Sequence, residues 1–171
     1  MTSYVALLRA VNVGGTGKLP MEELKAIGEA CGFDSVRTFI ASGNLLFASG
    51  EKEANAERMI AERLERQFGR PMPVFVRTAE EMAEVAAKNP FEDDRPSRVM
   101  AHFIREVPKE AMLEDVRDVS GERMALGPRC IYVSYGEGIG KTKLKLPAVK
   151  HGTARNLNTV ARLAALAAEL K

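Results

Sequence analysis

The order in which apolar runs and turn residues follow one another is the feature that most restricts what this chain can fold into. Four segments of the first half are rich in the β-branched, aromatic and other apolar residues typical of strands. These segments are 4–13, 36–41, 45–49 and 72–78. The second and third of them flank Ser42, Gly43 and Asn44, a short glycine-containing link that predicts a hairpin.

Two segments with apolar residues at helical spacing separate these strands. Over 20–31 the spacing predicts a helix that Pro20 opens and Gly32 closes, and over 53–68 it predicts a second helix that ends at Gly69. The first 78 residues therefore follow the order strand, helix, strand, strand, helix, strand. This is the βαββαβ order of ferredoxin-like folds.

The rest of the chain repeats this order less regularly. It contains a charged, proline-flanked loop at 89–97 and a final helix that begins near Asn156. Between them the pattern predicts a strand at 98–107, a helix at 108–116 and a hairpin at 122–135. We therefore expect an α+β protein with a ferredoxin-like first half, 1–78, and a related second half, 79–171, in a single compact unit.

Composition argues against several classes of protein. The 25 Lys and Arg residues nearly balance the 23 Asp and Glu residues, which is unlike a strong DNA-binding protein. No apolar run approaches the roughly 20 residues of a membrane-spanning helix, and the first residues lack a signal-peptide pattern. Cys31 and Cys130 lie in apolar pattern, so we expect a cytoplasmic protein with two buried thiols.

Metal and nucleophilic sites find little support in the sequence. The two histidines are far apart, and His102 is expected to be a packed residue of its strand. The acidic run Glu92, Asp93 and Asp94 has ligand chemistry for a hard cation, but solvation explains it in a proline-flanked loop. No metal site is predicted.

The glycine-rich stretch after the first strand predicts where a site would lie. In a ferredoxin-like sheet the first and third strands are the central antiparallel pair, so the end of one lies beside the start of the other. We expect NVGG (12–15) to meet SGN (42–44) there, beside a helix start that favours anions. Arg9 and Lys18 would add positive charge. Turn chemistry explains each glycine and asparagine taken singly, so only their convergence favours a site.

A nucleotide-binding P-loop does not fit either glycine-rich stretch. Ending at Gly17 and Lys18, the first has Asn12 where a glycine belongs and Leu19 where a hydroxyl belongs. The second, 135–144, has Tyr135 in the first glycine position.

A basic segment, 141–155, carries Lys, His and Arg but no acidic residue. It has the charge to meet phosphate or nucleic acid, although the alternative is a solvated loop, which charge runs usually are. It runs into HGTARNLNT (151–159), which precedes or opens the last helix and offers Thr153, Asn156 and Asn158 as capping residues. Arg155 opposes the helix dipole there, so we expect it to face a ligand or pair with a carboxylate.

The motifs LLRAVNVGG, TFIASGNLLF and GTARNLNTV, in this order, resemble the DUF1697 family of bacterial proteins of unknown function. The resemblance implies an α+β fold with ferredoxin-like subdomains, and it names no activity or cofactor. Family members usually carry an aromatic residue where this chain has Leu157. The motif positions that it implies as site residues are Arg9, Asn12, Gly14, Gly15, Ser42, Gly43, Asn44, Thr153, Arg155, Asn156 and Thr159.

The leading hypothesis is a protein that binds a small anionic or phosphate-containing ligand where the three motifs meet. Arg9 and Arg155 would hold the anion, and the asparagines would orient the ligand. One alternative is a nucleic-acid-binding module, for which the sheet offers the aromatic residues Tyr4 and Phe47. The other is a structural protein in which all three motifs are turns.

Overall fold

The computed structural model describes residues 1–9, 19–39 and 43–170, and the chain divides into two units. The first unit contains Met1–Met82 and Leu163–Lys171, and the second contains Ala83–Arg162. The sequence prediction divides the chain after residue 78. The end of the last helix belongs to the first unit, although the sequence places it in the second half. There Glu169 Oε2 lies 3.8 Å from Arg37 Nη1.

The first unit has the predicted βαββαβ order. Its sheet has the strand order β2-β3-β1-β4 with antiparallel neighbours, which is the ferredoxin-like arrangement with the first and third strands at the centre. Its elements are β1 (Thr2–Leu8), α1 (Met21–Ala30), β2 (Asp34–Thr38), β3 (Asn44–Ser49), α2 (Glu53–Phe68) and β4 (Val74–Thr78).

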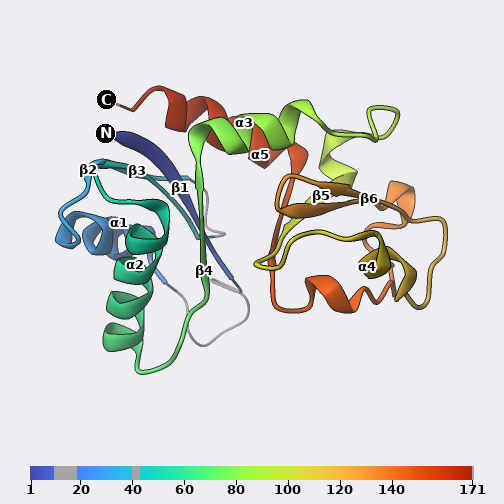
Figure 1. Ribbon diagram of the computed structural model, residues 1–171, viewed down its shortest axis with the longest axis horizontal. Helices are drawn as coiled ribbons and strands as arrows, with labels where there is room; N and C mark the ends of the chain where they lie inside the picture. The colour runs from blue at the N-terminus through green and yellow to red at the C-terminus, as the bar shows by residue number, and fades with distance from the viewer. Residues whose placement is uncertain (10–18, 40–42, 171) are drawn as a thin grey trace. The chain divides into compact units, whose positions relative to one another are not determined.

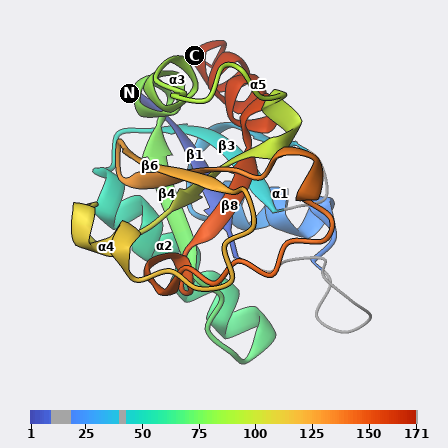
Figure 2. The same cartoon turned by 90° about the vertical axis from the view of Figure 1, so that its right-hand side faces the viewer.

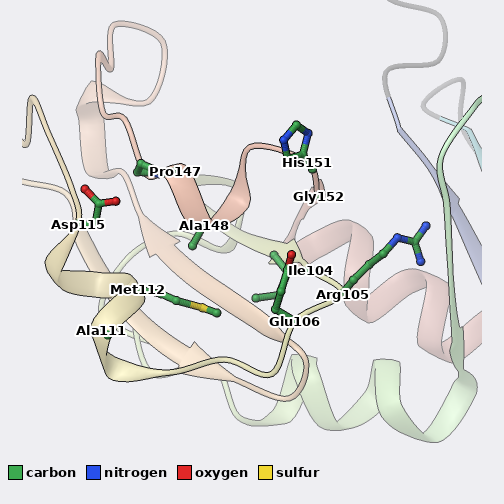
Figure 3. A pocket seen from close by; sticks show the side chains of 10 residues that line it. All are labelled: Ile104, Arg105, Glu106, Ala111, Met112, Asp115, Pro147, Ala148, His151 and Gly152. Atoms are coloured by element: carbon green, nitrogen blue, oxygen red, sulfur yellow. The ribbon is translucent and has the colours of Figure 1, made fainter.

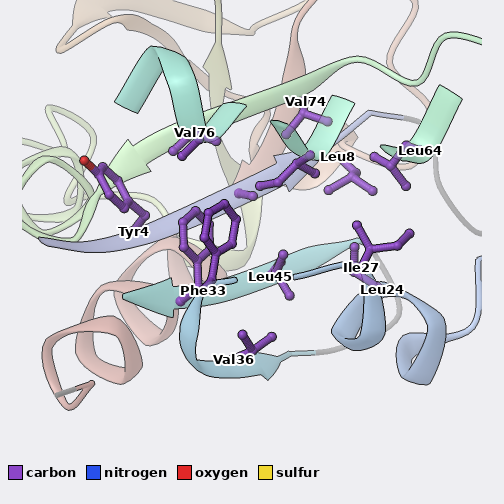
Figure 4. Packing of buried hydrophobic residues seen from close by; sticks show 14 of the residues in the cluster. Tyr4, Leu8, Leu24, Ile27, Phe33, Val36, Leu45, Leu64, Val74 and Val76 are labelled. Carbon is purple, nitrogen blue, oxygen red and sulfur yellow. The ribbon is translucent and has the colours of Figure 1, made fainter. Parts of the chain in front are cut away.

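Both helices of this unit cover the same face of the sheet (Figure 1). The side chains between these helices and the sheet form a continuous core (Figure 4). In this core Phe33 stacks on Phe47 with ring centroids 4.1 Å apart. Tyr4 packs beside Phe47, and its hydroxyl donates to the carbonyl of Glu51 at 2.7 Å. Each large apolar side chain buried in this way contributes about 1.5–3 kcal/mol.

The second unit repeats the sheet order of the first. Its strands lie in the order β6-β7-β5-β8, again antiparallel, so its first and third strands are central as well. The fourth strand, β8, corrects the sequence prediction, which treated these residues as part of the entry to the last helix. The elements from residue 79 onward are α3 (Ala79–Ala87), η1 (Pro96–Arg98), β5 (Val99–Phe103), α4 (Glu110–Glu114), β6 (Arg123–Gly127), β7 (Cys130–Ser134), η2 (Gly136–Gly138), η3 (Pro147–Val149), β8 (Thr153–Asn156) and α5 (Leu157–Ala168).

The second unit differs from the first in what covers its sheet. The connection from β7 to β8 forms the short 3₁₀ turns η2 and η3, where the first unit has the long helix α2. The other helix, α4, is short and lies beside β6 (Figure 2). Ile104, Ile131, Val133 and Leu146 form a small core under α4 and η3. Among the described residues, no helix combines the length and apolar composition needed to cross a membrane.

Candidate functional site

The first two motifs adjoin at one edge of the first sheet, as far as the structure describes them. The N–H of Leu8 at the end of β1 donates to the carbonyl of Gly43 at 2.9 Å, and Leu7 pairs with Asn44 at the start of β3. The N–H of Arg9 donates to Pro73 at 3.0 Å, just before β4. The predicted meeting of the first and third strands is therefore confirmed for these residues. Asn12, Gly14, Gly15 and Ser42 lie outside the described residues.

Asn44 is completely buried and takes part in closing the β2–β3 connection. Its Nδ2 donates to the carbonyl of Phe39 at 2.9 Å, and its own carbonyl accepts from the N–H of Phe39 at 3.2 Å. Gly43 has a φ of 80°, in the left-handed region that favours glycine. These contacts are those of a turn, which was the alternative explanation for both residues.

Arg155 lies on β8, and this corrects its predicted place in the first turn of the last helix. It pairs with Ala101 of the neighbouring strand β5, and the side chain is 6% exposed. Its Nη1 donates to Thr153 Oγ1 at 2.7 Å and to the carbonyl of Ala154 at 2.9 Å. Burial lowers the pKa of Arg155 to about 10, because removal from water disfavours the charged form.

Asn156 is the capping residue of α5. Its Oδ1 accepts the N–H of Thr159 at 2.9 Å, which satisfies one of the free donors at the start of a helix. The sequence offered three residues for this role, and the structure places Asn156 in it, while Asn158 is exposed.

The described motif residues divide between the two units. Arg9, Gly43 and Asn44 belong to the first unit, and the residues of the third motif belong to the second. A single site shared by all three motifs stays a prediction.

Two pockets in the second unit have no counterpart in the sequence prediction. The first, named here the His151 pocket, has a volume of about 470 Å³ (Figure 3). Met112 and Ala148 lie toward its interior, while Asp115 and His151 lie on opposite sides of it (Figure 3). The other residues that line it are Ile104, Arg105, Glu106, Ala111, Pro147 and Gly152.

The second, named here the His102 pocket, has a volume of about 490 Å³. His102 is partly buried, and its Nε2 lies 3.1 Å from Tyr135 Oη. The alternation of side chains along β5 places His102 on the same face as Met100, but alternation does not show how completely that face is covered. The residues that line this pocket are His102, Val133, Tyr135, Leu144, Lys145, Leu146, Pro147, Val149 and Lys150.

The acidic run Glu92, Asp93 and Asp94 forms hydrogen bonds with other side chains of the protein. Asp93 receives two hydrogen bonds of 3.0 Å from Arg123, which hold its pKa below the usual value. Asp94 accepts from Ser134 Oγ at 2.7 Å, and this hydrogen bond lowers the pKa of Asp94. In the described part of the chain, no group of three or more potential metal ligands is found.

The second glycine-rich loop is also explained by internal contacts. Thr142 Oγ1, the hydroxyl nearest to the P-loop pattern, donates to Glu122 Oε2 at 2.6 Å. This contact uses the hydroxyl that a nucleotide loop would direct to magnesium.

Comparisons with known proteins agree with this fold. The structure of conserved bacterial protein SP0830 from Streptococcus pneumoniae matches with a TM-score of 0.75 and 26% sequence identity. The match covers 97% of this chain and 98% of that one. None of the curated proteins compared with the chain matches it. The model of DUF1697, described as a protein of unknown function, matches residues 1–132, which include the first two motifs but not the third. The chain therefore belongs to the DUF1697 family.

Proposed function

We propose that the protein binds a small anionic or phosphate-containing ligand, and that Arg155 is the cation that holds it. The observation that carries this proposal is the buried guanidinium on β8, which Thr153 Oγ1 and the carbonyl of Ala154 hold in place.

Planar guanidinium groups suit carboxylates and phosphates because they donate two parallel hydrogen bonds. A guanidinium already held in position also loses less conformational entropy when the ligand binds. Arg9, Asn12 and the other motif residues would complete the site if the three motifs meet.

The nucleic-acid alternative loses one of its supports. Tyr4 and Phe47 both lie in the core of the first unit, where they cannot stack on bases. The lysines of the basic segment are exposed, which suits a solvated loop as well as a phosphate-binding surface. The cytoplasmic location stays a prediction from the sequence.

The proposal is tested by isothermal calorimetry with inorganic phosphate and with adenosine monophosphate. We expect one of them to bind the wild type, and Arg155→Gln to weaken binding about tenfold or more, the usual effect of losing a charge-assisted hydrogen bond. Arg155→Lys should keep part of the affinity. Arg162→Gln is the matched control, because Arg162 is exposed on α5.

Circular dichroism and thermal melting of each variant show whether the buried position still folds. Equal affinities for all folded variants, or no binding by the wild type, would contradict the role of Arg155. Arg9→Gln tests whether residues of the first unit contribute to ligand binding. It weakens binding if the motifs of both units share the ligand, and it has no effect if the second unit binds alone.

A further inference from the structure

The His102 pocket lies on the face of the second sheet opposite to Arg155. His102 pairs with Ala154 and Arg155 pairs with Ala101, and successive residues of a strand point to opposite faces. A ligand in this pocket would therefore be separate from the anion proposed at Arg155.

The pocket exists because this half of the protein lacks a second long helix. In the first unit α2 covers the sheet with 16 residues, and Ala56, Ile60 and Leu64 are fully buried in the core beneath it. In the second unit the corresponding connection forms only η2 and η3, which are 3 residues each. The space beside η3 has the size typical of small-molecule sites.

The lining of the pocket separates into an apolar part and a charged part. Val133, Leu144 and Val149 supply apolar surface from β7 and from the loop before β8. Among the described residues that line the pocket, the charged ones are Lys145 and Lys150, and both are exposed. The segment of Lys145 is fixed, because its backbone N–H and carbonyl both bond to Arg117 at 2.9 Å. This lining suits a ligand with an apolar body and a negative group.

The polar groups inside the pocket are uncharged near neutral pH. Burial lowers the pKa of His102 to about 4, so its ring is neutral. Burial, and to a smaller extent the charge of Glu122, raise the pKa of Tyr135, which keeps its phenol protonated. In a neutral imidazole one nitrogen donates and the other accepts, so the pair offers a hydrogen bond to a ligand oxygen without adding charge.

The His151 pocket does not indicate which class of ligand it would bind. Its lining includes Arg105 and His151, but also the acidic residues Glu106 and Asp115. The lining therefore favours neither a positively nor a negatively charged ligand.

We propose that the His102 pocket binds an amphipathic organic anion, a medium-chain carboxylate, with its apolar chain against Val133, Leu144 and Val149 and its carboxylate at Lys145 and Lys150. The probe is octanoate, titrated by calorimetry and by nuclear magnetic resonance of the His102 ring. We expect octanoate to bind and to shift the His102 signals. Each methylene removed from the chain should weaken binding roughly fourfold, the value expected for a buried methylene.

Two double variants, each of which removes two positive charges, test where the carboxylate of octanoate binds. Lys145→Gln with Lys150→Gln should weaken octanoate binding about tenfold, as expected for the loss of two favourable charge interactions. Lys141→Gln with Lys143→Gln should change it less than about twofold, because these exposed lysines belong to the same basic segment but do not line the pocket. Octylammonium should not bind.

No binding of octanoate to the wild type would overturn the proposal. So would equal weakening by both double variants, or binding of octylammonium as tight as that of octanoate.

Discussion

Gly152 lies where the chain enters β8 and passes closely against β5. A Cβ atom at this position would come within 2.2 Å of the carbonyl oxygen of Phe103, and backbone cannot move aside as the end of a flexible side chain can. The N–H of Gly152 also donates to Val149 at 3.1 Å, which ties the end of η3 to the strand. The glycine is therefore required by a contact between segments far apart in the sequence.

We expect Gly152→Ala to destabilise the protein by about 1–3 kcal/mol, the usual cost of forcing an added carbon atom into a closely packed place. The midpoint of urea unfolding measures the change. Gly140→Ala is the matched control, since a Cβ there meets nothing within 4 Å, and its stability should stay equal or rise slightly. A midpoint for Gly152→Ala that equals the wild-type value would show that the loop shifts without cost.

Single residues also show how far the candidate site was predictable. The sequence placed Gly43 beside the end of the first strand, and the hydrogen bond from Leu8 confirms it. It did not predict that Asn44 is fully buried and bonded to Phe39, because a turn asparagine has the same local sequence whether it faces a ligand or its own backbone. The sequence placed Arg155 in the first turn of the last helix, whereas it lies on β8.

At the scale of elements, β8 is the one that the sequence prediction missed. Its four residues, Thr153–Asn156, include a charged and an amide side chain and show no apolar alternation. They form a strand because the edge of β5 is available for pairing, and such backbone hydrogen bonds do not depend on the side chains. The longer helices and the hairpin strands were predictable, because their apolar periodicity reflects one buried face.

The start of α5 gives a prediction at this scale. Asn156→Ala should lower the free energy of unfolding by about 1 kcal/mol, the usual cost of removing a capping side chain. Asn158→Ala is the control, since Asn158 is exposed and its side chain was the other asparagine offered for this role by the sequence. Thermal unfolding followed by circular dichroism measures both changes. If the two variants lost equal stability, the cap at Asn156 would contribute nothing specific.

At the scale of the whole molecule, the two units share one strand order but not one set of helices. The first unit buries one face of its sheet under two helices, and the second leaves two pockets beside η3. The difference follows from the connection before the last strand of each sheet. A long helix with a regular apolar face fills this place in the first unit, and a glycine- and lysine-rich loop occupies it in the second.

His102, on the partly covered face of the second sheet, should make the free energy of unfolding depend on pH. His102 has a pKa of about 4 in the folded protein, against about 6.5 when unfolded. Between these values the unfolded chain binds a proton that the folded protein does not, so stability falls as the pH drops through this window. The loss from this residue is at most about 3.5 kcal/mol, because each pH unit contributes about 1.4 kcal/mol.

Urea unfolding at several pH values from about 4 to 7 measures this dependence. His102→Gln should make it shallower than in the wild type, and His151→Gln, the change of the other histidine, is the control. Parallel curves for all three proteins would show that His102 is protonated as easily in the folded state as in the unfolded one.

The sequence by itself determined the α+β class, the ferredoxin-like order of the first half and the segments where unusual polar residues gather. These depend on local spacing, which records the faces that each helix and strand buries. Only the tertiary structure decided that Thr153–Asn156 complete a second sheet, that Arg155 is buried on it and that the His102 face stays partly open. Strand pairing and the coverage of a sheet are contacts between distant segments, and local sequence carries no record of them.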